Sequence, residues 1–138
     1  HANEIITALS HKYYKSDIKL KNTISSVIKD FASSGNIIIV GRAAVGITSE
    51  LKGGLNIRLV APVEWRINAL KKRKEFENTD PKKFIEENDA KKEKLIKRFC
   101  NININDVPFH LTINCEKFNQ DEIIDIISNT MRIMKLIN

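Results

Sequence analysis

The sequence predicts an α/β fold in which helices cover both faces of a mainly parallel sheet. Three observations predict it: a helical apolar pattern before residue 33, an uninterrupted β-branched run at 36–40 between two glycines, and strand and helix patterns that alternate afterwards. Uninterrupted apolar strands are typical of parallel sheets, because both of their faces are buried. Ligands of such sheets bind beyond the carboxyl ends of the strands, so we expect a site in the loops after Val40, Val60 and Asn114.

The individual elements are marked by apolar periodicity and by residues that favour helix ends. Proline at a first helical turn, Asp or Asn at an N-cap, and a final glycine are the end signals used. Asn119 with Glu122 three residues later predicts a capping box for the last helix. The expected order is a helix from Leu20 that stops at 33–35, strands at 36–40 and 55–60, a helix opened by Pro62, a helix from Pro81 to about Phe99, a strand at 111–114 and a helix after Asn119.

Length and composition indicate one ordinary globular domain, 1–138. The chain has 138 residues, of which 42% are hydrophobic and 29% charged, and this excludes disordered and collagen-like classes. Two cysteines, Cys100 and Cys115, and three histidines form neither a disulfide framework nor a zinc-binding spacing, so we expect reduced thiols, a cytoplasmic protein and no metal site in the chain. The apolar runs are much shorter than the roughly 20 residues of a membrane span, so no membrane partner is expected.

The positive charge is concentrated in one segment. The net charge is +6, and residues 64–98 hold 12 Lys and Arg against 8 Asp and Glu. Such a segment suits nucleic acid, nucleotide phosphate or simple exposure to solvent, and composition alone favours the last. We do not expect nucleic acid as a partner, since the sequence lacks the exposed aromatic platform that RNA-binding domains use.

The loop after the run at 36–40 has a spacing that suggests phosphate binding. Residues 41–48 read Gly-x-x-x-x-Gly followed by Ile-Thr, where a P-loop has Lys and then Ser or Thr. One interpretation is a degenerate P-loop. Another is that Arg42 itself grips a phosphate through its planar guanidinium. A third is that Arg42 is an exposed arginine in a turn.

The helix from Pro81 carries charge within its apolar face. Ile85, Asp89, Lys92 and Ile96 are spaced by three or four residues and share one side of the helix. Asp89 and Lys92 in that position indicate either an ion pair within the helix at the rim of the core, or groups directed at a polar ligand.

Four segments, in this order, resemble the cytidylate kinase-like family of P-loop nucleoside monophosphate kinases. The likeness extends from about Leu20 to the end of the chain. The segments are Ile39-Val40-Gly41-Arg42-Ala43-Ala44, Ile57-Arg58-Leu59-Val60-Ala61-Pro62, Asp89-x-x-Lys92 and Phe109-x-Leu111-x-Ile113-Asn114.

The resemblance implies transfer of the ATP γ-phosphoryl group, with Mg²⁺, to CMP or a similar pyrimidine monophosphate. Arg42 would then hold the phosphate of the acceptor, and Asp89 would belong to the acceptor site. Lys92 would be the catalytic cation near the transferring phosphoryl group, and Arg66 would face ATP. The helical region at about 72–105 would correspond to the lid of these kinases.

The departures from the family pattern concern the lid and the P-loop. Lys92 replaces a lid arginine, and Ile85 stands where the family has another. Residues 1–19 contain no glycine, so we expect that the N-terminal strand, P-loop and helix are missing from this chain and that it does not phosphorylate CMP by itself. The alternative is a non-catalytic nucleotide-binding or regulatory module derived from such a kinase.

Overall fold

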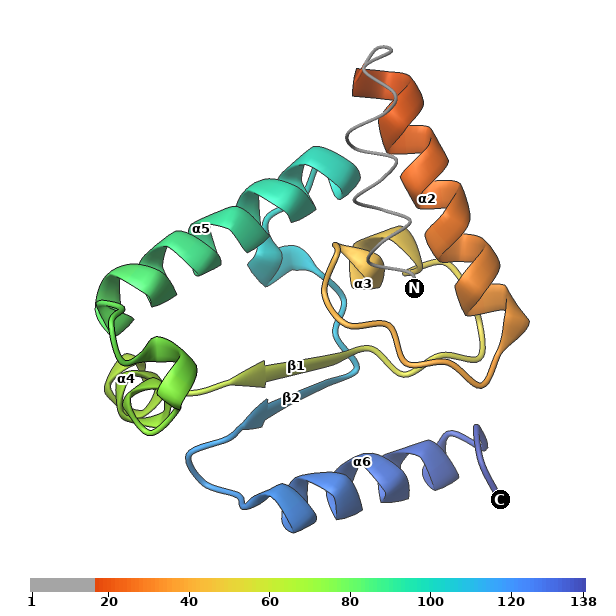
Figure 1. The fold of residues 1–138 in the computed structure, drawn as a ribbon. Helices are drawn as coiled ribbons and strands as arrows, with labels where there is room; N and C mark the ends of the chain where they lie inside the picture. The colour runs from red at the N-terminus through yellow and green to blue at the C-terminus, as the bar shows by residue number, and fades with distance from the viewer. Residues whose placement is uncertain (1–16) are drawn as a thin grey trace.

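A computed structural model describes residues 17–138, and these form an α/β structure (Figure 1). The expectation for the glycine-free N-terminus lies, up to residue 16, outside the described residues. Helices and a small parallel sheet follow one another along the chain. In order they are α2 (Asp17–Ser34), α3 (Ala44–Ile47), β1 (Ile57–Val60), α4 (Val63–Lys71), η1 (Lys74–Phe76), α5 (Pro81–Cys100), η2 (Ile104–Asp106), β2 (Leu111–Asn114) and α6 (Gln120–Ile133).

The sheet pairs β1 with β2 in parallel, in a register that runs from Ile57 opposite Leu111 to Val60 opposite Asn114. The connection between them contains α4 and α5, because parallel strands need a long crossover. In Figure 1, α5 lies on one side of the two strands and α6 on the other. The predicted layered α/β arrangement is therefore confirmed. The strand predicted at 111–114 is β2, and the strand predicted at 55–60 forms over Ile57–Val60.

The predicted helix ends are confirmed by their hydrogen bonds. Asp80 caps α5 by accepting bonds from the backbone N–H groups of Lys82 at 3.0 Å and Lys83 at 3.3 Å. Asn119 and Glu122 form both bonds of the capping box that begins α6, at 3.0 and 2.8 Å. These side chains satisfy backbone donors that the first turn of a helix leaves unpaired.

The strand predicted at 36–40 is wrong. This segment is not part of the sheet, and Ile38 and Val40 are 90% and 84% exposed. A strand requires a neighbour to receive its backbone hydrogen bonds, and within residues 17–138 the only sheet is the β1–β2 pair. An apolar β-branched run indicates a capacity to form a strand, but it does not identify the partner.

A small apolar core joins α2, the start of α3 and the end of α5. Ile24 and Ile28 of α2 pack with Ala43, Ala44 and Ile47, and partly buried side chains at the end of α5 cover them. This packing fixes the backbone of the loop that precedes α3.

Gly46 lies close to Cys100, which packs against this core. A Cβ atom at Gly46 would lie 2.2 Å from Cys100 Sγ and 3.0 Å from Cys100 Cβ. We therefore expect Gly46→Ala to lower the free energy of unfolding by about 1–3 kcal/mol, although alanine is the better helix former. Chemical denaturation checks this, and the matched double variant Gly46→Ala with Cys100→Ala should regain most of the loss. Equal losses with and without Cys100 would contradict the contact.

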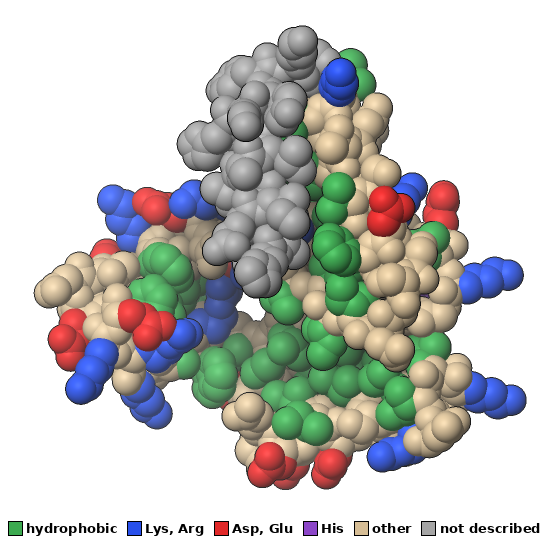
Figure 2. Space-filling model, turned by 45° about the vertical axis from the view of Figure 1, so that its right-hand side comes forward, with side chains coloured by type: hydrophobic (Ala, Val, Ile, Leu, Met, Phe, Trp, Pro, Cys, Tyr) green, Lys and Arg blue, Asp and Glu red, His purple; other side chains and the backbone are tan. Residues whose placement is uncertain are grey.

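One face of the molecule carries a broad band of hydrophobic side chains above α6 (Figure 2). Large apolar side chains that are more than half exposed include Ile38, Val40, Leu59 and Ile124. Large exposed apolar patches mark sites that contact other molecules. Among residues 17–138 no helix is long and apolar enough to cross a membrane.

Candidate functional site

The loop that carries Arg42 has an unusual backbone. Gly41, Arg42 and Ala43 have φ values of 70°, 58° and 56°, all in the left-handed region. This conformation costs a residue with a Cβ roughly 1–2 kcal/mol. The loop is held by the burial of Ala43 and Ala44 and by a 3.0 Å bond from the Ala44 N–H to the Gly41 carbonyl. Arg42 is therefore presented, exposed, from a strained and well-anchored turn.

The degenerate P-loop interpretation of 41–48 is wrong. Gly46, which would approach a phosphate in a P-loop, faces Cys100 of α5 instead. Thr48 Oγ1 donates a 2.8 Å hydrogen bond to the Ala44 carbonyl, so its hydroxyl closes the end of α3. Neither residue is placed to cradle a phosphate, and Arg42 is the remaining candidate in this loop.

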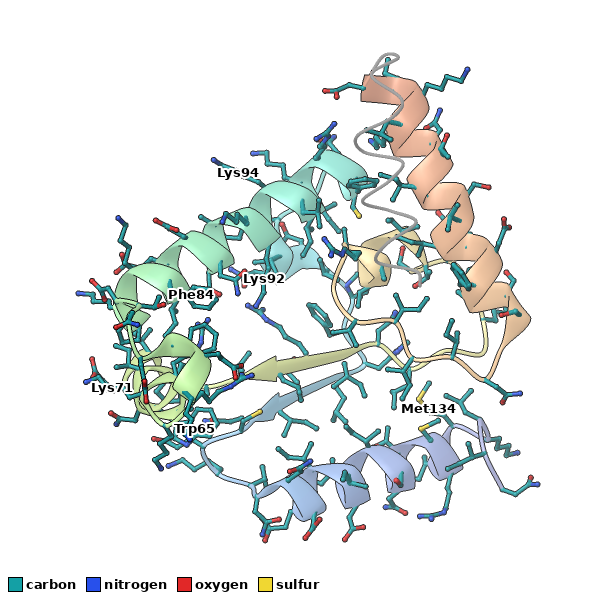
Figure 3. All side chains as sticks on the ribbon, in the orientation of Figure 1. Trp65, Lys71, Phe84, Lys92, Lys94 and Met134 are labelled. Atoms are coloured by element: carbon teal, nitrogen blue, oxygen red, sulfur yellow. The ribbon has the colours of Figure 1, made fainter. Side chains whose placement is uncertain are left out.

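Arg66 of α4 and Asp89 of α5 form a bidentate ion pair. Arg66 Nη1 donates to Asp89 Oδ2 and Nη2 donates to Oδ1, each at 2.7 Å. Two parallel charged hydrogen bonds make this the strongest kind of Arg–carboxylate contact. Lys92 Nζ lies 3.9 Å from Asp89 Oδ1, one helical turn away. Figure 3 shows Lys92 on the side of α5 that faces the sheet and Lys94 on the outer side.

The pair changes the titration of both partners. The hydrogen bonds from Arg66, and less strongly its charge and that of Lys92, lower the pKa of Asp89, although partial burial opposes this. The hydrogen bonds to Asp89 raise the pKa of Arg66. The side chains are 28% exposed at Arg66 and 41% at Asp89, so the pair is at the surface and accessible to a ligand.

This ion pair predicts a defined pH dependence of stability. The pKa of Asp89 is lower in the folded state, so its contribution is present above the unfolded value of about 3.9 and is lost as the pH falls through the folded value. We expect Asp89→Asn to lower the free energy of unfolding by about 0.5–1 kcal/mol between pH 5 and 8. The difference between variant and wild type should shrink below about pH 4. Urea titrations across this range test it, and a difference that persists at pH 2 would contradict it.

The predicted site residues fall into two groups. Arg66, Asp89 and Lys92 lie together in the structure. Arg42 belongs to the loop that contacts the end of α5, where Cys100 Sγ lies 3.9 Å from the Ala43 carbonyl. Along the helix axis this point is about 16 Å from Asp89. The loop that carries Arg42 and the ion pair therefore meet α5 at different points along its length.

Sequence reasoning missed two features of this region. It did not foresee that Asp89 pairs with Arg66, because the partners are 23 positions apart. It also missed Arg58, which lies over the Phe109 ring at 5.7 Å and donates to Asn105 Oδ1 at 3.2 Å. A charged residue inside an apolar strand pattern was the available signal. Burial of Ile85, which is 4% exposed, makes that position part of the packing of α5.

A groove of about 420 Å³ lies between α5 and η2, but it does not include the ion pair. Its charged lining comes from Glu93, Lys94 and Lys97. The pair is thus a surface site separate from this groove. In the described part of the chain, His, Cys, Asp and Glu side chains do not gather in a group of three that could hold a metal ion.

Comparison with known proteins assigns the family. The sequence model of the cytidylate kinase-like family matches residues 1–117. A cytidylate kinase from Methanocaldococcus jannaschii is 25% identical to this chain over 127 residues, which cover 90% of this chain and 71% of that protein. The family match spans the Arg42 loop, α4 and α5, and therefore both groups of site residues. The chain belongs to the cytidylate kinase-like family.

Proposed function

We propose that this protein takes part in transfer of the γ-phosphoryl group of ATP to CMP or a similar pyrimidine nucleoside monophosphate. The observation that carries the proposal is the cluster of Arg66, Asp89 and Lys92, which forms on α4 and α5 within the segment matched by the family. Phosphoryl transfer needs a protein to position two anionic substrates and to neutralise their charge. Two cations around one carboxylate, at an accessible surface, suit this requirement.

Each residue is given the role that the family resemblance implies and that its chemistry suits. Arg42 binds the phosphate of the acceptor, because an exposed guanidinium can grip two phosphate oxygens. Asp89 accepts hydrogen bonds from the nucleoside part of the acceptor. Arg66 binds the phosphates of ATP. Lys92, 59% exposed and flexible, follows the γ-phosphoryl group as a mobile positive charge.

The reaction is an in-line displacement at phosphorus. An oxygen of the acceptor phosphate forms a bond to the γ-phosphorus, the bond from that phosphorus to the β,γ-bridging oxygen breaks, and ADP leaves. Lys92 acts by stabilising charge on the transferring group. The family implies Mg²⁺ as well, but the described residues do not form a cage of carboxylates for it, so we assign no step to the metal.

We do not expect residues 1–138 to phosphorylate CMP by themselves, so the proposal is tested with the natively expressed protein at its full length, ATP, Mg²⁺ and a panel of nucleoside monophosphates. We expect CDP and ADP in equal amounts, and more product from pyrimidine than from purine acceptors. Lys92→Met should lower kcat by about 10²-fold. Lys94→Met is the matched control, since Lys94 lies on the outer side of the same helix (Figure 3). Nucleotide binding without any ADP would instead identify a non-catalytic nucleotide-binding module.

A further inference from the structure

Asp89 occupies the Nη1 and Nη2 end of the Arg66 guanidinium. Both of its terminal nitrogens donate to the carboxylate, each at 2.7 Å. The same two parallel donors are one of the pairs that a guanidinium can offer to two oxygens of a phosphate. A phosphate that approaches this end of the side chain therefore competes with the carboxylate.

The surroundings favour exchange over a permanent pair. Arg66 is 28% and Asp89 41% exposed, so a ligand can reach the pair, and separation of a partly exposed pair costs little. Lys92 Nζ already lies 3.9 Å from Asp89 Oδ1 and can move closer when Arg66 leaves. Lys92 would then neutralise part of the Asp89 charge, while the carboxylate oxygens that Arg66 leaves become available to another ligand.

The pair also connects two helices. Arg66 is on α4 and Asp89 is on α5, which pack against each other. A ligand that takes Arg66 from Asp89 would remove a link between these helices and would release the carboxylate for another ligand. The two events are then coupled in both directions, as thermodynamic linkage requires.

We propose that the Arg66–Asp89 pair is a latch that the polyphosphate part of a nucleoside triphosphate opens, so that Asp89 is released only when Arg66 has bound phosphate. This inference rests on the proposed function for the identity of the ligand. It adds an order of ligand binding: polyphosphate binds Arg66 first, and Asp89 is then available to bind the acceptor. Removal of the Asp89 charge should therefore strengthen polyphosphate binding at Arg66.

Inorganic tripolyphosphate is the probe for this experiment, and fluorescence of Trp65, the only tryptophan and the neighbour of Arg66, is the readout. We expect Asp89→Asn to bind tripolyphosphate about threefold to tenfold more tightly than the wild type. In an Arg66→Ala background the same substitution should give a much smaller gain, because the competition is absent. Circular dichroism of each variant establishes that the fold is retained.

Two charge-matched controls separate the latch from general electrostatics. Glu93→Gln removes a negative charge one turn after Asp89 on α5. Asp17→Asn removes a carboxylate on α2 that pairs with Arg98 of α5 at 2.6 Å. Neither should tighten binding as much as Asp89→Asn does. Equal gains in the controls, an unchanged or weaker affinity in Asp89→Asn, or a full gain without Arg66 would each overturn the latch. Absence of tripolyphosphate binding in both wild type and Asp89→Asn would also overturn it.

The outcome is independent of the test of the proposed function. Tripolyphosphate carries neither a base nor an acceptor phosphate, so the latch can fail while CMP is still phosphorylated. The latch can equally be present in a protein that forms no CDP.

Discussion

Ile85→Ala is expected to lower the free energy of unfolding by about 2–5 kcal/mol, the usual loss for truncation of a buried isoleucine. Ile85 is 4% exposed and is the buried residue of α5. The loss combines the transfer free energy of the removed methylene and methyl groups with a cavity that the surrounding side chains fill only in part. Urea denaturation followed by far-UV circular dichroism measures it.

The matched control is Ile133→Ala, at a position that is 73% exposed near the end of α6. It should change the free energy of unfolding by less than about 0.5 kcal/mol. A small effect at both positions would contradict the packing of α5 described here.

Arg42→Ala is expected to weaken CMP binding by about 1.5–3 kcal/mol, the range of hydrogen bonds to charged groups. This corresponds to a loss of roughly 10-fold to 150-fold in affinity. The reason is that the guanidinium of Arg42, presented from the turn at 41–43, is proposed to hold the phosphate of CMP. Calorimetric titration with CMP measures the change.

Two further variants make the Arg42 result specific. Arg42→Gly also removes the guanidinium but relieves the left-handed backbone at φ 58°, so it should lose the same affinity while being about 1 kcal/mol more stable than Arg42→Ala. Arg132→Ala removes a charge from the last turn of α6 and should leave CMP binding unchanged. Unaltered affinity in both Arg42 variants would reject Arg42 as the phosphate ligand.

The sequence was sufficient to predict where helices begin, but it was insufficient to predict which segments pair in a sheet. Caps such as Asp80 and Asn119 act within three residues, so their presence in the sequence already identifies the start of α5 and of α6. The run at 36–40 has the composition of a buried strand, yet a strand also depends on a neighbour distant in the chain, and composition does not specify that neighbour.

The same distinction applies to the candidate site. Helical spacing placed Asp89 and Lys92 on one face of α5, because the spacing is a local property. It offered an ion pair within the helix as one interpretation, whereas the dominant partner of Asp89 is Arg66 on another helix. Packing of α4 on α5 creates this contact, and a single sequence carries no direct record of it.

The most direct test of this account is a calorimetric comparison of CMP and cytidine, because the two ligands differ only in the phosphate that Arg42 is proposed to hold. We predict saturable binding of one CMP per chain, at least about tenfold tighter than cytidine. Equal affinities for CMP and cytidine, or no binding of CMP, would contradict the assignment of this surface as a nucleoside monophosphate site.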